Sequence, residues 1–436
     1  MVDKSGDEPE NPFKGTPFEQ FFGAGMPDLS TLMNQMQAMM TPQDGPVNWS
    51  MARDIARRGV PTPDPTPSAS DEAATASALR LADLWLDDAT EFPSGVTTTA
   101  TWSRADWIEQ TMPVWEELVG PVADQVVGAL SRSIPEEARG MAGPLMGMLN
   151  QVGSALFGSQ VGQALGALAE DVLTSTEIGL PLAPAGRAAL VPTNVRAFAE
   201  GLQASYDDLL LYLALREAAH LRLFAHVPWL RDYVWSAVID YARGMEFNFD
   251  GLQEQLGAIN PMDTEAMQQA MDGGLLEPKR SPAQDAALRR LETVLALIEG
   301  WVDEVVGQAV SERMPSASAM QETIRRRRAA GGPAEQTFAT LVGLELRPRR
   351  LRDASTLWGS LRSRQGIEAR DGVWLHPDLL PTAADLDDPL GFREDHLAEV
   401  ELSEDDFDVA LRNLLDGSEG EGPTSSPDDP QDGPTP

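Results

Sequence analysis

The sequence predicts a mainly α-helical protein, in which a body of many helices with little or no sheet lies between acidic tails that we expect to be disordered. Three observations support this fold class. Apolar residues recur at intervals of three and four along most of the chain. Almost no stretch alternates with the period of two that marks a half-buried strand. Both ends of the chain are rich in Pro, Gly and Asp, and such segments cannot bury enough apolar surface to fold.

Residues 1–67 are expected to form a mostly disordered arm, because the prolines of 61–67 fix the backbone and remove hydrogen-bond donors. Within this arm, Leu and Met residues between positions 29 and 40 recur at helical spacing, which predicts a short Met-rich amphipathic helix. Two interpretations stay open for this helix. It can fold back onto the core of the protein, or it can dock on a partner.

The helical body is expected over residues 68–395. Inside it, Gly158, Gly162 and Gly166 fall at every fourth position, and each costs a helix about 1 kcal/mol relative to Ala. We therefore expect another helix to approach closely along this smooth face. The periodicity predicts helices at 70–88, 103–118, 120–132, 145–173, 193–226, 228–243, 262–272, 281–313, 317–329, 334–344 and 350–363.

The C-terminal region is acidic, with eleven Asp and Glu residues between positions 385 and 408. We expect an acidic helix over 396–416 and a disordered tail over 417–436. Positive charge gathers just before this region, because eight arginines lie between Arg325 and Arg352. These arginines can pair with acidic groups of the same chain, or they can form a site for RNA or a nucleotide.

Composition and charge exclude several function classes. The 33 Lys and Arg against 68 Asp and Glu give a net charge of −35, so the surface repels nucleic acid and anionic lipid. The absence of Cys rules out thiolate zinc clusters, iron–sulfur centres and Cys nucleophiles. No stretch has the uninterrupted apolar length of a membrane span, and the opening residues lack a secretory leader. We expect a cytoplasmic protein; its oligomeric state does not follow from the sequence.

Ionisable residues set into an apolar segment mark the candidate site. Arg216, Glu217 and His220 lie within about one turn of each other on a predicted helix whose other residues are mostly Leu and Ala. Buried ionisable groups need partners or a metal ion. Pro228 should end this helix near His226 and begin the next one, because the residue before proline avoids the helical conformation.

The stretch Glu217-Ala-Ala-His220 is similar to the second half of the motif HExxH, in which two His side chains one turn apart bind zinc and the Glu activates the metal-bound water. Together with GSQVGQALGALAEDVL and RDGVWLHPDLLPTAADLDDP, it resembles the zincin-like metallopeptidase type 2 family of actinobacteria over about residues 45–395. The resemblance implies a zincin-like helical body, a zinc cofactor and peptide hydrolysis with Glu217 as the catalytic base.

One position departs from this pattern, because Arg216 stands where the first zinc-binding His belongs. A guanidinium group has no lone pair to give to a metal ion. The remaining candidate zinc ligands are His220, His226 and, from the predicted helix 281–313, Glu299. Alternatively, Arg216 forms a buried ion pair with Glu299 or Asp303, and His220 is a hydrogen-bonded core residue.

Two functions therefore stay open. The first is a metal-dependent hydrolase that acts on peptides. The second is an inactive zincin scaffold that binds a peptide or protein partner, with Arg216 and Asp303 as binding residues.

Overall fold

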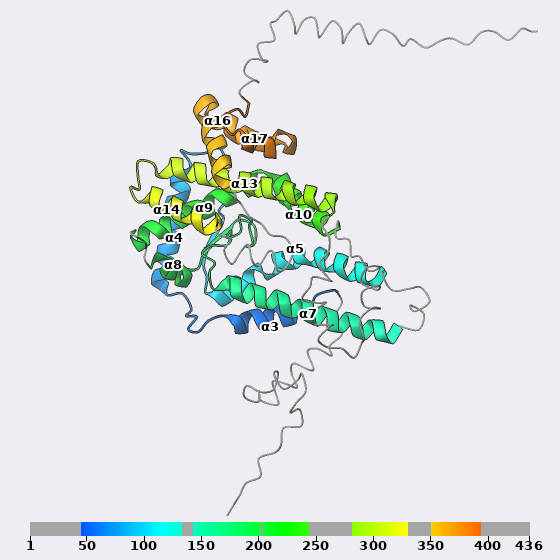
Figure 1. Cartoon of the computed structure of the whole chain (residues 1–436). Helices are drawn as coiled ribbons and strands as arrows, with labels where there is room; N and C mark the ends of the chain where they lie inside the picture. Colours follow the sequence, from blue (N-terminus) through cyan, green and yellow to red (C-terminus); the bar gives the residue numbers. More distant parts are fainter. Residues whose placement is uncertain are drawn as a thin grey trace, which may run out of the picture.

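A computed structural model describes residues 45–132, 143–200, 202, 204–243, 281–329 and 350–393 (Figure 1). Several expectations fall outside these ranges. They are the Met-rich helix, the helices at 262–272 and 334–344, the acidic helix at 396–416 and the tail at 417–436.

Helices make up most of the described chain, so the prediction of a mainly α-helical fold with little sheet is confirmed. The longer helices are α3 (Trp49–Gly59), α4 (Ala69–Leu86), α5 (Arg104–Arg132), α7 (Gly143–Ala169), α8 (Pro192–Ala199), α9 (Tyr206–His226), α10 (Pro228–Arg243), α13 (Pro282–Val310), α14 (Ala317–Ala329) and α16 (Leu351–Gly372). Short helical segments follow at Val373–Leu375 (η1), Pro377–Leu379 (η2) and Ala383–Asp387 (α17). Strands β1 (Thr98–Thr101) and β2 (Arg187–Leu190) form a parallel pair in which Thr98 lies opposite Arg187.

Helix α3 lies in the stretch that we expected to belong to the arm, yet it packs along α7 (Figure 1). A Cβ atom at Gly158 would lie 2.5 Å from the main-chain oxygen of Asn48, and one at Gly162 would lie 2.5 Å from that of Ala52. The glycines of α7 therefore let the two backbones come together, as their spacing predicted. α3, which precedes residue 68, therefore packs on the helical body, because this close approach gives its small apolar face a surface on which to pack.

Two helix boundaries differ from the sequence expectation. The predicted helix 193–226 is two helices, because α8 ends at Ala199 and Ser205 caps α9 by accepting a hydrogen bond from the backbone of Asp208. The predicted helices 103–118 and 120–132 are instead one helix, α5, with Pro113 and Pro121 inside it. A proline inside a helix costs about 3 kcal/mol. Burial of large side chains on the inner face of α5 offsets this cost, among them Trp107, Ile108, Met112 and Trp115.

Helix α13 lies at the centre of the body and contacts α9, α10, α14 and α16. It is buried on nearly all sides from Val294 to Val306, and its crossing with α16 is so close that a Cβ at Gly300 would lie 2.5 Å from that of Ala354. No helix in the described ranges is long and apolar enough to cross a membrane.

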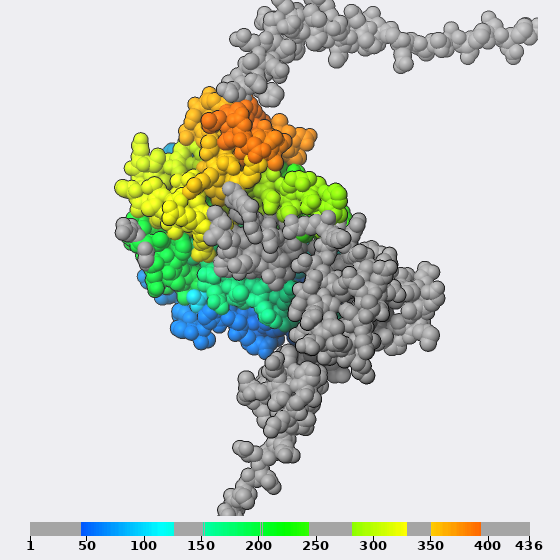
Figure 2. All heavy atoms as spheres, in the orientation of Figure 1, coloured from blue at the N-terminus to red at the C-terminus, as the bar shows by residue number. Residues whose placement is uncertain are grey.

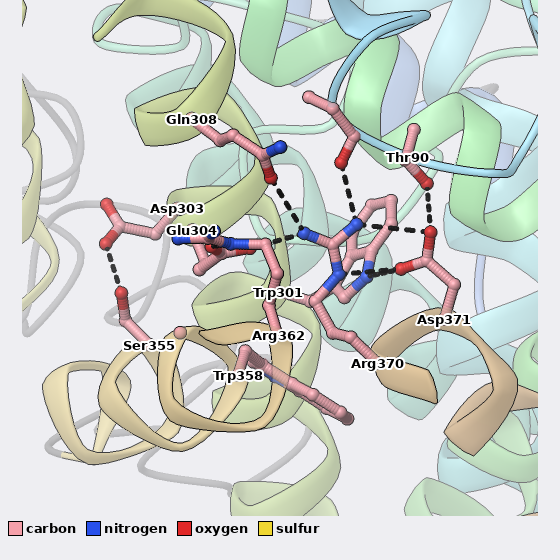
Figure 3. A network of polar contacts seen from close by, with 12 residues as sticks. Thr90, Trp301, Asp303, Glu304, Gln308, Ser355, Trp358, Arg362, Arg370 and Asp371 are labelled. Atoms are coloured by element: carbon pink, nitrogen blue, oxygen red, sulfur yellow. Dashed lines mark hydrogen bonds and ion pairs between the residues drawn. The ribbon is translucent and has the colours of Figure 1, made fainter. Parts of the chain in front are cut away.

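A buried polar network fixes α13 against α16 and the segment that follows α4 (Figure 3). Arg370 of α16 donates to the main-chain oxygen of Ala89 at 2.7 Å and to Asp371 at 2.8 Å, and it pairs with Glu304 of α13. Asp371 in turn accepts from Thr90 at 2.6 Å and from the indole of Trp301 at 2.9 Å. The network holds the α13 segment that carries the candidate site residues Glu299 and Asp303 in a fixed position.

Candidate functional site

The candidate site lies on α9, where it faces α13. α9 begins at the Ser205 cap with Asp207 and Asp208 in its first turn, where acidic groups favour the helix dipole, and it ends at His226 before Pro228 as predicted. Between Leu209 and Leu223 nearly every side chain is buried. The helix therefore carries its three adjacent ionisable residues into the core.

The Glu217 carboxylate is held by hydrogen bonds from the segment between α7 and α8. Its Oε2 accepts from the backbone N–H of Thr176 at 3.1 Å and from the Thr176 hydroxyl at 2.6 Å. Its Oε1 accepts from the Ser175 hydroxyl and from the backbone N–H of Ala189 in β2, the latter at 3.1 Å. Four donors therefore occupy the carboxylate, and Glu217 anchors this segment and β2 to α9. A general base, by contrast, needs a lone pair directed at the proton it removes.

Arg216 and Glu299 form a buried ion pair, as one of the two sequence interpretations expected. Arg216 Nη2 lies 2.6 Å from Glu299 Oε2, and Arg216 Nη1 lies 3.8 Å from Asp303 Oδ1. The side chains of Arg216 and Glu299 are only 6% and 2% exposed. The guanidinium thus bridges α9 to two carboxylates one turn apart on α13.

Glu299 also contacts two further basic side chains. Its Oε1 lies 3.0 Å from His220 Nε2 and 3.0 Å from Arg328 Nη2 of α14. Burial raises the pKa of Glu299, but the charges of Arg328, His220 and Arg216 outweigh burial, so the pKa lies well below its usual range. The backbone of Gly179 packs against Glu299 Oε1, since a Cβ atom at Gly179 would lie 2.7 Å from this oxygen.

Both ring nitrogens of His220 face protein acceptors. Nδ1 lies 2.8 Å from the main-chain oxygen of Arg216 one turn earlier, and Nε2 faces Glu299. Each ring nitrogen is thus directed at a protein oxygen. In this arrangement His220 is a hydrogen-bonded core residue.

His226 lies apart from this cluster. It is exposed at the end of α9, its Nδ1 lies 2.9 Å from the main-chain oxygen of Arg222, and its ring stacks on Phe92 at 6.0 Å. The structure therefore brings Arg216, His220, Glu299 and Asp303 together, directs Glu217 to the segment before β2 and leaves His226 at the helix end.

Sequence reasoning did not assign two groups of residues to the site. Ser175 and Thr176, which hold Glu217, lie in a segment with no recognisable motif. Arg325 and Arg328 belong to the run of arginines noted in the sequence. One of the two interpretations of that run was that its arginines pair with acidic groups of the same chain. That interpretation is confirmed for Arg325 with Asp303, Arg327 with Glu177 and Arg328 with Glu299.

The residues of the site do not fit a zinc ion as they are arranged. A guanidinium takes the place of the first ligand, Glu299 is neutralised by basic side chains, and Glu217 is occupied by hydrogen bonds. Within the described ranges, no three His, Asp or Glu side chains are placed to hold one metal ion. A divalent cation beside Glu299 would also meet repulsion from Arg216 and Arg328.

Two comparisons with known proteins found a match. A crystal structure from Chloroflexus aurantiacus, described as a candidate hydrolase with a novel fold, is similar to this chain with a TM-score of 0.55 and 22% sequence identity. The match covers 79% of this chain and 96% of that one, and it supports the fold alone. No curated protein matches the sequence. The profile of the zincin-like metallopeptidases matches residues 47–392. The chain therefore belongs to the zincin-like metallopeptidase family.

Proposed function

We propose that this protein is a zincin-family scaffold that binds a peptide or protein partner without hydrolysing it through zinc. The observation that carries the proposal is the 2.6 Å contact between Arg216 and Glu299. It puts a permanent cation where the family pattern has a metal ligand, and it satisfies a carboxylate that zinc would need.

A groove beside the second half of α9 supports the binding role. It has a volume of about 500 Å³, within the range of ligand pockets. Leu221 and Phe224 of α9, Val114 of α5, and Pro181 and Pro184 of the segment before β2 contribute apolar walls. Leu221 follows Glu217 by one turn, so the groove continues the helix face that carries the motif.

The rim of this groove adds polar groups to its apolar walls. Arg231 of α10 and Glu117 of α5 line the groove and form an ion pair with each other. An apolar pocket with a few polar groups is suited to side chains of a peptide, because the walls bury apolar surface and the polar groups set the direction of binding.

The competing function is metal-dependent peptide hydrolysis, and family membership favours it. It requires His220 and Glu299 to leave their present partners, and it requires Glu217 to exchange hydrogen bonds from Ser175 and Thr176 for a metal-bound water. Each of these changes breaks contacts between fully buried groups.

Zinc content and peptidase activity decide between the two functions. Protein purified without a His tag should hold much less than one zinc ion per chain by elemental analysis. It should not cleave a mixture of peptides, with or without added zinc. Stoichiometric zinc that is lost in the His220→Ala variant, together with cleavage, would establish the hydrolase instead.

The binding role needs its own experiment. Peptides selected from a display library on the wild-type protein should bind Ala225→Trp much more weakly, because Ala225 lines the groove and a large ring there fills it. Leu156→Trp is the matched control, since Leu156 is an exposed side chain of α7 that does not line the groove. Equal binding to both variants would contradict binding in the groove.

A further inference from the structure

Three arginines from one short helix reach three acidic side chains of the body. In α14, Arg325 contacts Asp303, Arg328 contacts Glu299, and Arg327 contacts Glu177 and the main-chain oxygen of Asp171. The ring of Phe198 lies 5.1 Å from the Arg327 guanidinium. We call Glu177, Glu299 and Asp303 the arginine receptor.

The fourth arginine of the run shows that the inward direction is specific. Arg326 lies between Arg325 and Arg327, yet its side chain is 78% exposed and pairs only with Glu322 of the same helix within the described ranges. Helical geometry places Arg325 and Arg328 on one face, while Arg326 points away. The receptor therefore holds particular guanidinium groups rather than a diffuse positive charge.

The receptor is built into the core, whereas α14 lies on the surface (Figure 2). The side chains of Glu299 and Asp303 are 2% and 1% exposed, and both belong to the central helix α13. Among the side chains of α14 with described burial, the buried apolar ones are Ala317, Met320 and Ile324. Elements with few buried apolar contacts open before the core does, so α14 can leave while the receptor stays in place.

α14 leaves part of the receptor unsatisfied. Arg325 directs both Nε and Nη2 to Asp303 Oδ2, which also accepts from Ser355 at 2.8 Å. Asp303 Oδ1 has no hydrogen-bond partner in the described part of the chain, although the side chain is fully buried, and the same holds for Arg216 Nη1, 3.8 Å away. A guanidinium fork normally engages both oxygens of a carboxylate. Asp303 Oδ1 faces Arg216 at ion-pair distance but keeps a hydrogen-bonding capacity that a better-placed guanidinium would use.

We propose that the arginine receptor is a binding site for arginine side chains of a basic partner peptide, and that α14 is its internal occupant. The net charge of −35 attracts such a peptide, and the planar fork of arginine suits paired carboxylates better than the ammonium group of lysine does. The receptor shares no residue with the groove beside α9, so peptide binding at the receptor is distinct from peptide binding in that groove.

Competition between α14 and the partner follows from this arrangement. A tethered helix competes at an effective concentration of about millimolar, so a peptide at micromolar concentration meets a receptor that is mostly filled. Loss of Arg325 and Arg328, which contact Asp303 and Glu299, should open the receptor to a peptide in solution. Loss of the exposed Arg326 and Arg352 should not.

The experiment measures binding of a fluorescent peptide with the sequence MQETIRRRRA, which is that of residues 320–329, by anisotropy at physiological salt. The test variant is Arg325→Ala/Arg328→Ala. The control is Arg326→Ala/Arg352→Ala, whose two side chains are 78% and 64% exposed, and it has the same net charge. The test variant should bind the peptide at least about tenfold more tightly than the control and the wild type. Equal affinity for all three proteins, or no binding to any, would overturn the proposal.

Hydrogen exchange on the wild-type protein gives a second test that needs no variant to fold. A millimolar concentration of the same peptide should speed exchange of the α14 amides and leave those of α13 unchanged. The matched peptide with lysine in place of its four arginines has the same charge and should have a smaller effect. Exchange of α14 that does not respond to the arginine peptide, or that responds equally to both peptides, would also overturn the proposal.

Discussion

Replacing Glu299 by Gln should destabilise the protein more than replacing Arg216 by Met. Glu299 contacts Arg216, His220 and Arg328, whereas Arg216 has a single carboxylate at hydrogen-bond distance. Removing one partner of a buried ion pair costs roughly 3–5 kcal/mol. We expect about 3 kcal/mol for Arg216→Met, because Arg328 and His220 still face Glu299, and about 5 kcal/mol for Glu299→Gln, which leaves two buried guanidinium groups without that carboxylate.

The double variant separates the pair from its surroundings. Its loss of unfolding free energy should be smaller than the sum of the single losses by roughly 1–3 kcal/mol. Each single variant leaves one charge of the pair without its partner, whereas the double variant removes both charges. The assay is urea denaturation followed by circular dichroism; urea is preferred because guanidinium would compete with the arginines. The exposed pair of Arg57 and Glu109, 2.8 Å apart, is the control and should show a coupling below about 1 kcal/mol. Additive losses for Arg216 and Glu299 would refute the reasoning.

Two further predictions concern the packing of α3 on α7. Gly162→Ala should destabilise the protein by roughly 1–3 kcal/mol, because its Cβ would lie 2.5 Å from the main-chain oxygen of Ala52. The control is Gly153→Ala on the same helix, whose Cβ would meet nothing within 4 Å. This control should leave the stability unchanged or raise it by up to about 1 kcal/mol. Urea denaturation compares them, and equal effects would show that the helices do not approach so closely. Deleting residues 1–60 should lower the melting temperature by about 5 °C or more relative to deleting 1–44, since α3 and its flanks bury apolar side chains; equal melting temperatures would contradict this.

Much of the fold follows from the sequence, because local patterns determine helices. Periodic apolar residues gave the helical body, and the proline at 228 placed the boundary between α9 and α10. The spacing of Gly158, Gly162 and Gly166 predicted a close helix contact without showing which helix makes it. The helix at 193–226 was predicted too long, although Gly201 and the capping residue Ser205 offered a break signal in the sequence.

For the site, the sequence by itself determined that Arg216, Glu217 and His220 enter the core and that Arg216 needs a carboxylate. A charged group on an apolar helix face is buried wherever that helix packs, so this conclusion needs only the local pattern. Only the tertiary structure decided the partners. Four donors that engage Glu217 come from Ser175, Thr176 and Ala189, and Arg328 reaches Glu299 from a helix further along the chain. Hydrogen bonds between distant segments depend on how packed helices are placed in space, and no spacing along the chain encodes that placement.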